Sequence, residues 1–217
     1  MKQLLTLFFI VVTSAMTKAQ TTGHLQYEME FSSDNPDMAM ALPMMAGSKM
    51  DLYFMPEKSR LEMVMGRFMK MNSTVDVNTQ KGMLLMEVMG NKTATEINLS
   101  NAIAENTTEP KTTVTNETKT IIGFNCTKII VQGEDGSEAT LWVTKELMAA
   151  LKGQKQFGNT EIEGVPLEFY TLTNGMTIHF TATNFDGNVN ANIFSMEIPE
   201  GYKMVTEEEL KNMGKGF

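Results

Sequence analysis

Apolar and polar residues alternate along much of the chain with a period of two, which is typical of β-strands that are buried on one face. The first such segment contains Leu25, Tyr27, Met29 and Phe31, with Gln and Glu between them. Further segments of this kind, separated by Pro, Gly and Asn, are found at residues 50–55, 59–65, 67–77, 83–88, 93–97, 120–131, 139–143, 166–172, 176–183 and 189–196. The pattern predicts a mainly β fold in which neighbouring strands are antiparallel.

The connections between these segments differ in length. Asp-Gly or Asn-Gly dipeptides at 135–136, 174–175 and 186–187 predict hairpin turns. Two prolines and a glycine predict a longer loop at 34–48. Within this loop, residues 38–42 are long enough for one helical turn. The polar residues 100–117 predict another long connection.

Two short helices are predicted beside the strands. Residues 145–151 follow Thr144, whose hydroxyl can accept a hydrogen bond from a free amide at the start of a helix. Thr206 and Glu209 form a capping box, and three acidic residues in the first turn favour the positive end of the helix that follows. The expected fold class is therefore mainly β, with one or two short helices.

The first 19 residues have the three parts of a secretory signal peptide. Lys2 supplies a positive charge, Leu4 to Val12 form an apolar run, and Thr17-Lys18-Ala19 gives a cleavage site before Gln20. The apolar run is too short to span a bilayer, and no later stretch is long enough. We expect a protein exported to the periplasm of a Gram-negative bacterium, in which residues 20–217 form a single β-rich domain without an integral membrane segment.

The charge of the chain disfavours two kinds of partner. The formal net charge is −8. Loss of the two lysines of the signal peptide, which contains no acidic residue, takes this value to about −10. An acidic chain repels phosphate groups, so binding to nucleic acid and charge-driven attachment to an anionic membrane are not expected.

Methionine is concentrated in one part of the chain, because 13 methionines fall between Met38 and Met89. Within this part, Met63, Met65, Met69 and Met71 share one parity and should therefore lie on one face of the sheet. Arg67 interrupts this face, which suggests a bulge, an edge position or a contact with an anionic head group. Flexible thioethers suit a core, or an apolar wall that adapts to a ligand or partner.

Thioethers are also soft ligands for Cu(I). The loop before the second strand and the start of that strand carry five candidates: Met38, Met40, Met44, Met45 and Met50. A thioether is a weak donor, however, and no histidine or cysteine lies among these residues to strengthen the set.

Residues suited to catalysis are few. His24 and His179 are the two histidines and alternate with inward-facing positions, so both are expected on the outer face of the sheet. The single cysteine, Cys126, lies among apolar residues and is expected to be buried. Serine-hydrolase, phosphate-loop and zinc-peptidase motifs are absent from the sequence. We therefore expect no enzyme and no cofactor.

Several segments together resemble a known family. They include Thr120-Ile121-Ile122-Gly123-Phe124-Asn125-Cys126-Thr127-Lys128, Leu141-Trp142-Val143-Thr144, Glu163-Gly164-Val165-Pro166-Leu167-Glu168 and Ile198-Pro199-Glu200-Gly201-Tyr202. The chain is similar to the exported, methionine-rich bacterial proteins of domain-of-unknown-function family four-four-one-two. The resemblance implies a fold like that of the periplasmic lipoprotein carriers, an incompletely closed antiparallel barrel or strongly curved sheet. It implies no catalytic residue.

Three functions are compatible with these features. The first is non-enzymatic binding of a lipid, an acyl chain, another hydrophobic ligand or a lipidated partner by Met63, Met65, Met69, Met71 and Arg67. The second is a Cu(I) or soft-metal chaperone or buffer that uses the five loop methionines. The third is a structural envelope protein. The sequence does not determine the ligand or the oligomeric state.

Overall fold

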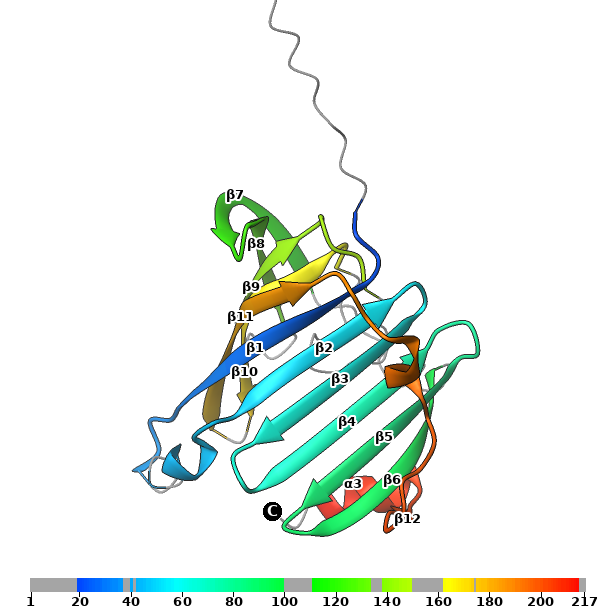
Figure 1. Ribbon diagram of the computed structural model, residues 1–217. Coiled ribbons are helices and arrows are strands. Elements are labelled where there is room, and N and C mark those ends of the chain that lie inside the picture. The colour runs from blue at the N-terminus through cyan, green and yellow to red at the C-terminus, as the bar shows by residue number, and fades with distance from the viewer. Residues whose placement is uncertain are drawn as a thin grey trace, which may run out of the picture.

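The computed structural model describes residues 19–36, 40, 42–99, 111–133, 138–149, 162–173 and 175–214. The predicted signal peptide therefore lies outside the described residues, except for Ala19. The strands in this part of the chain form one sheet (Figure 1). They are β1 (Gly23–Ser32), β2 (Lys49–Met55), β3 (Lys58–Met65), β4 (Met69–Asp76), β5 (Lys81–Val88), β6 (Asn91–Asn98), β7 (Lys111–Ile121), β8 (Phe124–Gln132), β9 (Glu138–Thr144), β10 (Val165–Thr173), β11 (Met176–Asp186) and β12 (Lys203–Met204).

The sheet is built from two runs of neighbouring strands that meet at β1. Its order is β12-β6-β5-β4-β3-β2-β1-β11-β10-β9-β8-β7, so β11 returns to pair with β1. All neighbours are antiparallel except β12 and β6, which are parallel. Strands β1 to β6 form one half in Figure 1, and β7 to β11 curve away from it. Because β12 and β7 do not pair with each other, the barrel is not closed. This confirms the predicted fold class.

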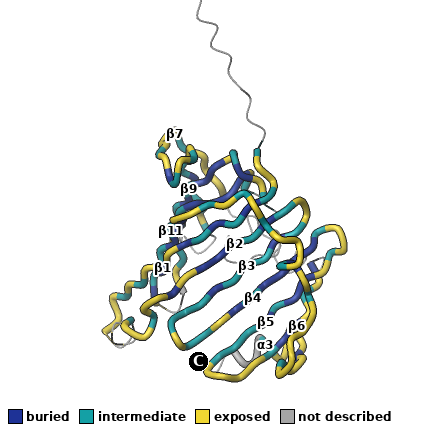
Figure 2. The backbone as a smooth tube through the Cα atoms, in the orientation of Figure 1, coloured by how far each residue is buried: buried dark blue, intermediate teal, exposed yellow. Residues whose placement is uncertain are grey.

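The inner face of the curved sheet carries the main apolar core. In β1, burial alternates residue by residue, as the period of two predicted. Side chains from both halves of the sheet meet in one cluster, which includes Leu25, Tyr27, Leu52, Phe54, Phe169 and Phe180. Strand β3 shows the same alternation (Figure 2). The two halves are therefore held together by burial of apolar surface on one side of the sheet.

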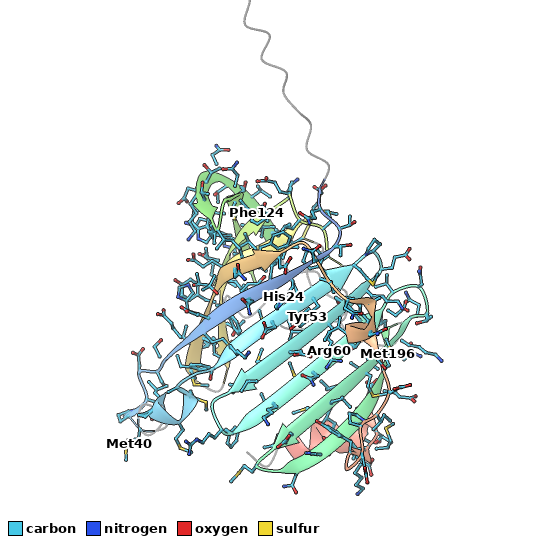
Figure 3. The ribbon with its side chains drawn as sticks, in the orientation of Figure 1. His24, Met40, Tyr53, Arg60, Phe124 and Met196 are labelled. Atoms are coloured by element: carbon cyan, nitrogen blue, oxygen red, sulfur yellow. The ribbon has the colours of Figure 1, made fainter. Side chains whose placement is uncertain are left out.

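The outer face of β3 to β6 is crossed by the chain that follows β11 (Figures 1 and 3). We call residues 187–202 the strap. It contains the 3-10 helix η3 (Ala191–Phe194), which begins where the Asn190 side chain accepts a hydrogen bond from the Asn192 backbone N–H. Met196 and Tyr202 of the strap pack on a second, smaller apolar cluster on β5 and β6. The strap therefore covers part of a face that the alternation alone leaves exposed.

The strap corrects two predictions. Residues 189–196 were predicted as a strand, and Asp186-Gly187 as a hairpin turn, but β11 ends at Asp186 and the chain continues across the sheet. Asp186 Oδ1 accepts a hydrogen bond from the Asn188 backbone N–H at 2.9 Å, which turns the chain away from β11. Instead of extending the sheet, the segment packs Met196 against the outer face.

The predicted connection over residues 100–117 is wrong in its second part, because β7 begins at Lys111. Nearly all of β7 is exposed, so its sequence lacks the alternation that marks a half-buried strand. The predicted strand at 120–131 is likewise divided, since a turn at Ile122 and Gly123 joins β7 to β8. The turn predicted at 135–136 lies outside the described residues. The hairpin predicted at Asn174-Gly175 is confirmed, because Thr173 of β10 pairs with Met176 of β11, although Asn174 itself lies outside the described residues.

The helix predictions had mixed results. Helix α3 (Glu207–Gly214) forms behind its capping box, in which the Thr206 N–H donates to Glu209 Oε2 and the Glu209 N–H donates to Thr206 Oγ1. Residues 145–149 are not helical, and residues 150–151 lie outside the described part. A 3-10 helix, η1 (Leu42–Met45), lies in the predicted long loop. Of the helical turn predicted at 38–42, residues 38, 39 and 41 lie outside the described residues. The part of the chain described here has no helix long and apolar enough to cross a membrane.

Candidate functional site

Methionines of four adjacent strands lie side by side on the inner face. The strand register pairs Met50 with Met63, Met63 with Met71, and Met71 with Met86. Tyr27 continues this row on β1, opposite Met50. Directly paired side chains have Cβ atoms about 4.5–5.5 Å apart, so neighbouring thioethers lie within reach of one another. We call these four methionines the methionine ladder.

The predicted methionine face is confirmed as a geometric arrangement. Met65 pairs with Met69 one step along from the pair of Met63 and Met71, so all four lie on the face of the ladder. Met63 and Met71 are buried, whereas Met65, Met69 and Met86 are half-buried. The thioether surface therefore runs from the sealed core toward an accessible edge. Whether a ligand binds there stays a prediction.

Arg67 is not part of this face. It lies in the turn between β3 and β4, where the Phe68 N–H donates to the Met65 carbonyl oxygen at 3.0 Å, and its side chain is exposed. The interruption of the pattern therefore marks a hairpin turn, neither a bulge nor a continuing strand.

The structure divides the predicted copper set by burial. Met40 is 82% exposed and Met44 is 64% exposed, while Met50 is 0% exposed because it belongs to the methionine ladder. Met45 is half-buried, and Met38 lies outside the described residues. Figure 3 shows Met40 at the tip of its loop, away from the body of the sheet. Among the residues described, no group of three or more His, Cys, Asp or Glu side chains could hold a metal. Copper binding by the loop stays a prediction.

The two histidines lie on the outer face as predicted, but each has close partners. His24 Nε2 is 2.8 Å from Asp51 Oδ1, and its ring stacks on Tyr53 with the centroids 4.1 Å apart. Burial, followed by the charge of Asp51, raises the pKa of Tyr53 above its ordinary value. His179 stacks on Tyr170 at the same centroid distance. The alternation predicted the face, but the partners come from neighbouring strands.

Cys126 is buried, as its apolar surroundings predicted. Burial raises the pKa of its thiol to about 11. The side chain is therefore a neutral thiol at neutral pH, which does not favour nucleophilic chemistry.

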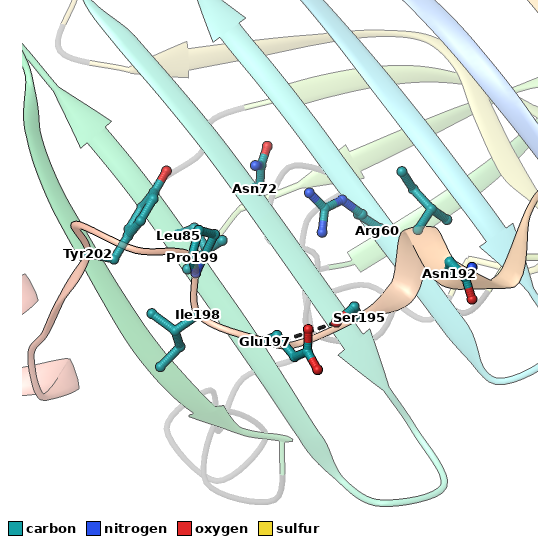
Figure 4. A pocket seen from close by; sticks show the side chains of 10 residues that line it. Arg60, Asn72, Leu85, Asn192, Ser195, Glu197, Ile198, Pro199 and Tyr202 are labelled. Carbon is teal, nitrogen blue, oxygen red and sulfur yellow. Dashed lines mark hydrogen bonds between the residues drawn. The ribbon is translucent and has the colours of Figure 1, made fainter.

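The outer face also holds a pocket that the sequence did not indicate. It has a volume of about 410 Å³ and lies between the strap and β3 to β5 (Figure 4). The floor is formed by Arg60, Asn72 and Leu85. The strap contributes Asn192, Ile193, Ser195, Glu197, Ile198, Pro199 and Tyr202. The segment 198–202 carried part of the family resemblance, but nothing in its sequence shows which strands it crosses.

Arg60 is the centre of a hydrogen-bond network at the pocket floor. Its Nε donates to Glu62 Oε1 at 2.7 Å and its Nη1 donates to Thr74 Oγ1 at 3.3 Å. When the Asn72 amide is oriented to satisfy its neighbours, its oxygen accepts from Arg60 Nη2 at 3.3 Å and its nitrogen donates to the Met71 carbonyl oxygen. The guanidinium is therefore fixed in position beneath the strap.

The family model for a domain of unknown function, DUF4412, matches residues 35–191. The chain belongs to this family. The match agrees with the resemblance carried by the sequence motifs. Among curated proteins, none matches this DUF4412 chain.

Structures of one solved protein share the fold of this DUF4412 chain but little of its sequence. Two structures of PNGF-II have TM-scores of 0.55 and 0.53 with 16% and 15% sequence identity. Each covers 89% of this chain, which spans only 33% and 32% of PNGF-II. An uncharacterized conserved protein from Thermus thermophilus has a TM-score of 0.49 and 9% identity, over 87% of this chain and 91% of that protein. The likeness to PNGF-II concerns the fold alone.

Proposed function

We propose that the protein is an exported, non-enzymatic binding protein that holds a lipid, an acyl chain or another hydrophobic ligand against the inner face of its open sheet. The methionine ladder is the observation that supports this proposal. Four thioethers on adjacent strands form a continuous apolar surface without a branched or aromatic side chain among them. Each methionine has three rotatable bonds beyond Cα, so the surface can adapt to a ligand without backbone movement.

The gradient of burial suggests where such a ligand would enter. Met50, Met63 and Met71 are buried, and Met65, Met69 and Met86 are half-buried beside them. A ligand that contacts the half-buried thioethers first gains apolar burial at the accessible edge. Movement of the flexible ladder side chains then extends the contact toward the core.

Fluorescence titration with dansyl-labelled undecanoic acid tests this proposal. We expect saturable binding by the wild-type protein and by Met65→Leu, because leucine keeps an apolar side chain of similar volume. Met65→Asn places an amide on the face and should weaken binding about tenfold or more. Native mass spectrometry of protein purified from its own cells should in addition detect a bound amphiphile.

Met89→Asn is the matched control. Met89 lies in the turn between β5 and β6, is exposed and has a φ of +50°, which asparagine tolerates well. The same chemical change there should leave the titration unchanged. Absence of both probe binding and a co-purified amphiphile would contradict the proposal, as would equal effects of the two asparagine variants when both are folded.

Export is tested separately from binding. The Gln20 N–H donates to the Glu146 carbonyl oxygen at 2.7 Å, and the Met148 N–H donates to the Gln20 carbonyl oxygen at 2.9 Å. Cleavage before Gln20 would leave both hydrogen bonds intact. We expect the protein in the periplasmic fraction after osmotic shock, with Gln20 at its N-terminus by mass spectrometry. Cytoplasmic protein that keeps Met1 would contradict the export proposal.

A further inference from the structure

The pocket beneath the strap lies on the opposite face of the sheet from the methionine ladder. Its volume of about 410 Å³ falls near the small end of the range of ligand pockets, about 300–1,000 Å³. It combines apolar side chains with amide, hydroxyl, guanidinium and carboxylate groups. This mixture of a few fixed polar groups among apolar ones is the usual composition of a small-molecule site.

The charges around the pocket indicate what kind of molecule it accepts. Arg60 is its one cationic lining residue, and the Arg60 charge is already paired with Glu62. Glu197 adds a carboxylate to the lining. A free anion would therefore meet no uncompensated positive charge. Glu197 is exposed, so water screens its carboxylate and the attraction it offers to a cation is weak. The lining favours a neutral ligand.

The hydrogen-bonding groups indicate the chemistry of that ligand. Arg60 has five N–H donors, of which the hydrogen bonds to Glu62, Thr74 and Asn72 use three. The amide of Asn192 can both donate and accept. The planar guanidinium and amide groups each present neighbouring hydrogen-bonding atoms. They can therefore bind two adjacent hydroxyl groups of a ligand, because each hydroxyl can both donate and accept.

Apolar contact is available beside these polar groups. Leu85, Pro199 and the ring of Tyr202 line the pocket, and Lys92 Nζ lies 5.8 Å from the centroid of the Tyr202 ring and helps to fix it. Such a surface suits the C–H faces of a sugar ring. We propose that this pocket binds a neutral polyhydroxylated ligand, a sugar residue, held by Arg60, Asn72 and Asn192 against Tyr202.

Saturation-transfer NMR with the mature protein tests the proposal directly. The probes are neutral sugars, namely glucose, galactose, N-acetylglucosamine and their disaccharides, with gluconate and glucosamine as charged counterparts. We expect transfer to at least one neutral sugar and weaker or no transfer to its charged counterpart. Lack of binding by all the neutral sugars at about 10 mM, an affinity near 3 kcal/mol, would overturn the proposal. Tighter binding of the charged compounds would also overturn it.

Variants at two positions locate the bound sugar. Asn192→Ala should weaken the affinity for the sugar about tenfold. It leaves the cap of η3 in place because Asn190 supplies that cap. Tyr202→Phe keeps the ring and should retain binding within about threefold, whereas Tyr202→Ala should abolish it. Asn125→Ala, the same change at an exposed position near the start of β8, is the control and should have no effect.

These variants also separate this proposal from the proposed function on the inner face. Asn192→Ala should leave the binding of dansyl-labelled undecanoic acid unchanged, because the strap lies on the outer face. Sugar binding that is unaffected by both Asn192→Ala and Tyr202→Ala would place the sugar elsewhere and overturn the proposal.

Discussion

At the scale of single residues, Tyr27 places one polar group inside the apolar inner face. It is 1% exposed, and its hydroxyl donates to the Pro166 carbonyl oxygen at 2.9 Å. Burial raises the pKa of the hydroxyl, which keeps it a neutral donor. We expect Tyr27→Phe to lower the free energy of unfolding by about 1–2 kcal/mol, since the buried carbonyl oxygen loses its donor. Tyr27→Ala should cost about 3–5 kcal/mol through the cavity it leaves. Urea denaturation measures both, and a Phe variant as stable as wild type would show that Pro166 finds another donor.

Asp76 gives a prediction about pH at the same scale. Burial alone would raise its pKa, but hydrogen bonds from the Thr79 and Asn78 backbone N–H groups and from Lys58 outweigh burial, so the pKa is lowered below its ordinary value of 3.8. The folded state therefore favours the carboxylate. The resulting stability is present above about pH 3.8 and is lost as the pH falls through the lower folded-state pKa.

The variant Asp76→Asn tests this dependence. We expect it to lower the free energy of unfolding by about 1–2 kcal/mol at pH 7, because the charge-assisted hydrogen bonds are replaced by weaker ones. Denaturation curves at a series of pH values should show the difference from wild type shrinking below about pH 3.8. A difference that stays constant to about pH 2 would mean that the carboxylate charge is not the cause.

At the scale of elements, the turn between β3 and β4 is fixed against η1 by Gly66. Its φ is +51°, and a Cβ atom there would lie 1.9 Å from the Met44 carbonyl oxygen. The Gly66 N–H also donates to Ser48 Oγ at 2.9 Å. We expect Gly66→Ala to lower the free energy of unfolding by about 3 kcal/mol or more, from the left-handed φ together with the backbone clash.

The turn between β5 and β6 offers the control for Gly66. Gly90 has a φ of +87° with nothing within 4 Å of a Cβ atom, so Gly90→Ala should cost only about 1–2 kcal/mol for the backbone conformation. Thermal denaturation of the two alanine variants separates the clash from the φ penalty. Equal losses would show that η1 moves away from the turn without cost.

At the scale of the whole molecule, the exposure of the methionines predicts an order of oxidation. Mild peroxide should convert the exposed Met40, Met44 and Met89 to sulfoxides first and the half-buried Met65 and Met86 more slowly. Met50, at 0% exposure, should react only as fast as the protein opens. Peptide mass spectrometry over time measures these rates. If a hydrophobic ligand occupies the inner face, it should slow Met65 and Met86 and leave Met40 unchanged, whereas equal slowing of all of them would argue against a bound ligand there.

Several features followed from the sequence alone because they depend on near neighbours in the chain. The period of two located most strands and the inner face, including the shared side of Met63, Met65, Met69 and Met71. The capping box of Thr206 and Glu209 predicted α3, since both of its hydrogen bonds join residues three apart. Local geometry was sufficient for these features.

The tertiary structure decided what depends on contacts between distant segments. Strand β7 forms at an exposed edge, where no buried face imposes alternation, and the alternating residues 189–196 pack on the outer face because the sheet already presents an apolar surface there. Strand register placed Met50 and Met86 beside Met63 and Met71, which made a ladder out of methionines that the sequence assigned to separate segments. The strap brought Asn192 and Tyr202 to the same pocket as Arg60. Such juxtapositions follow from the pairing and curvature of the whole sheet, which no local pattern of residues encodes.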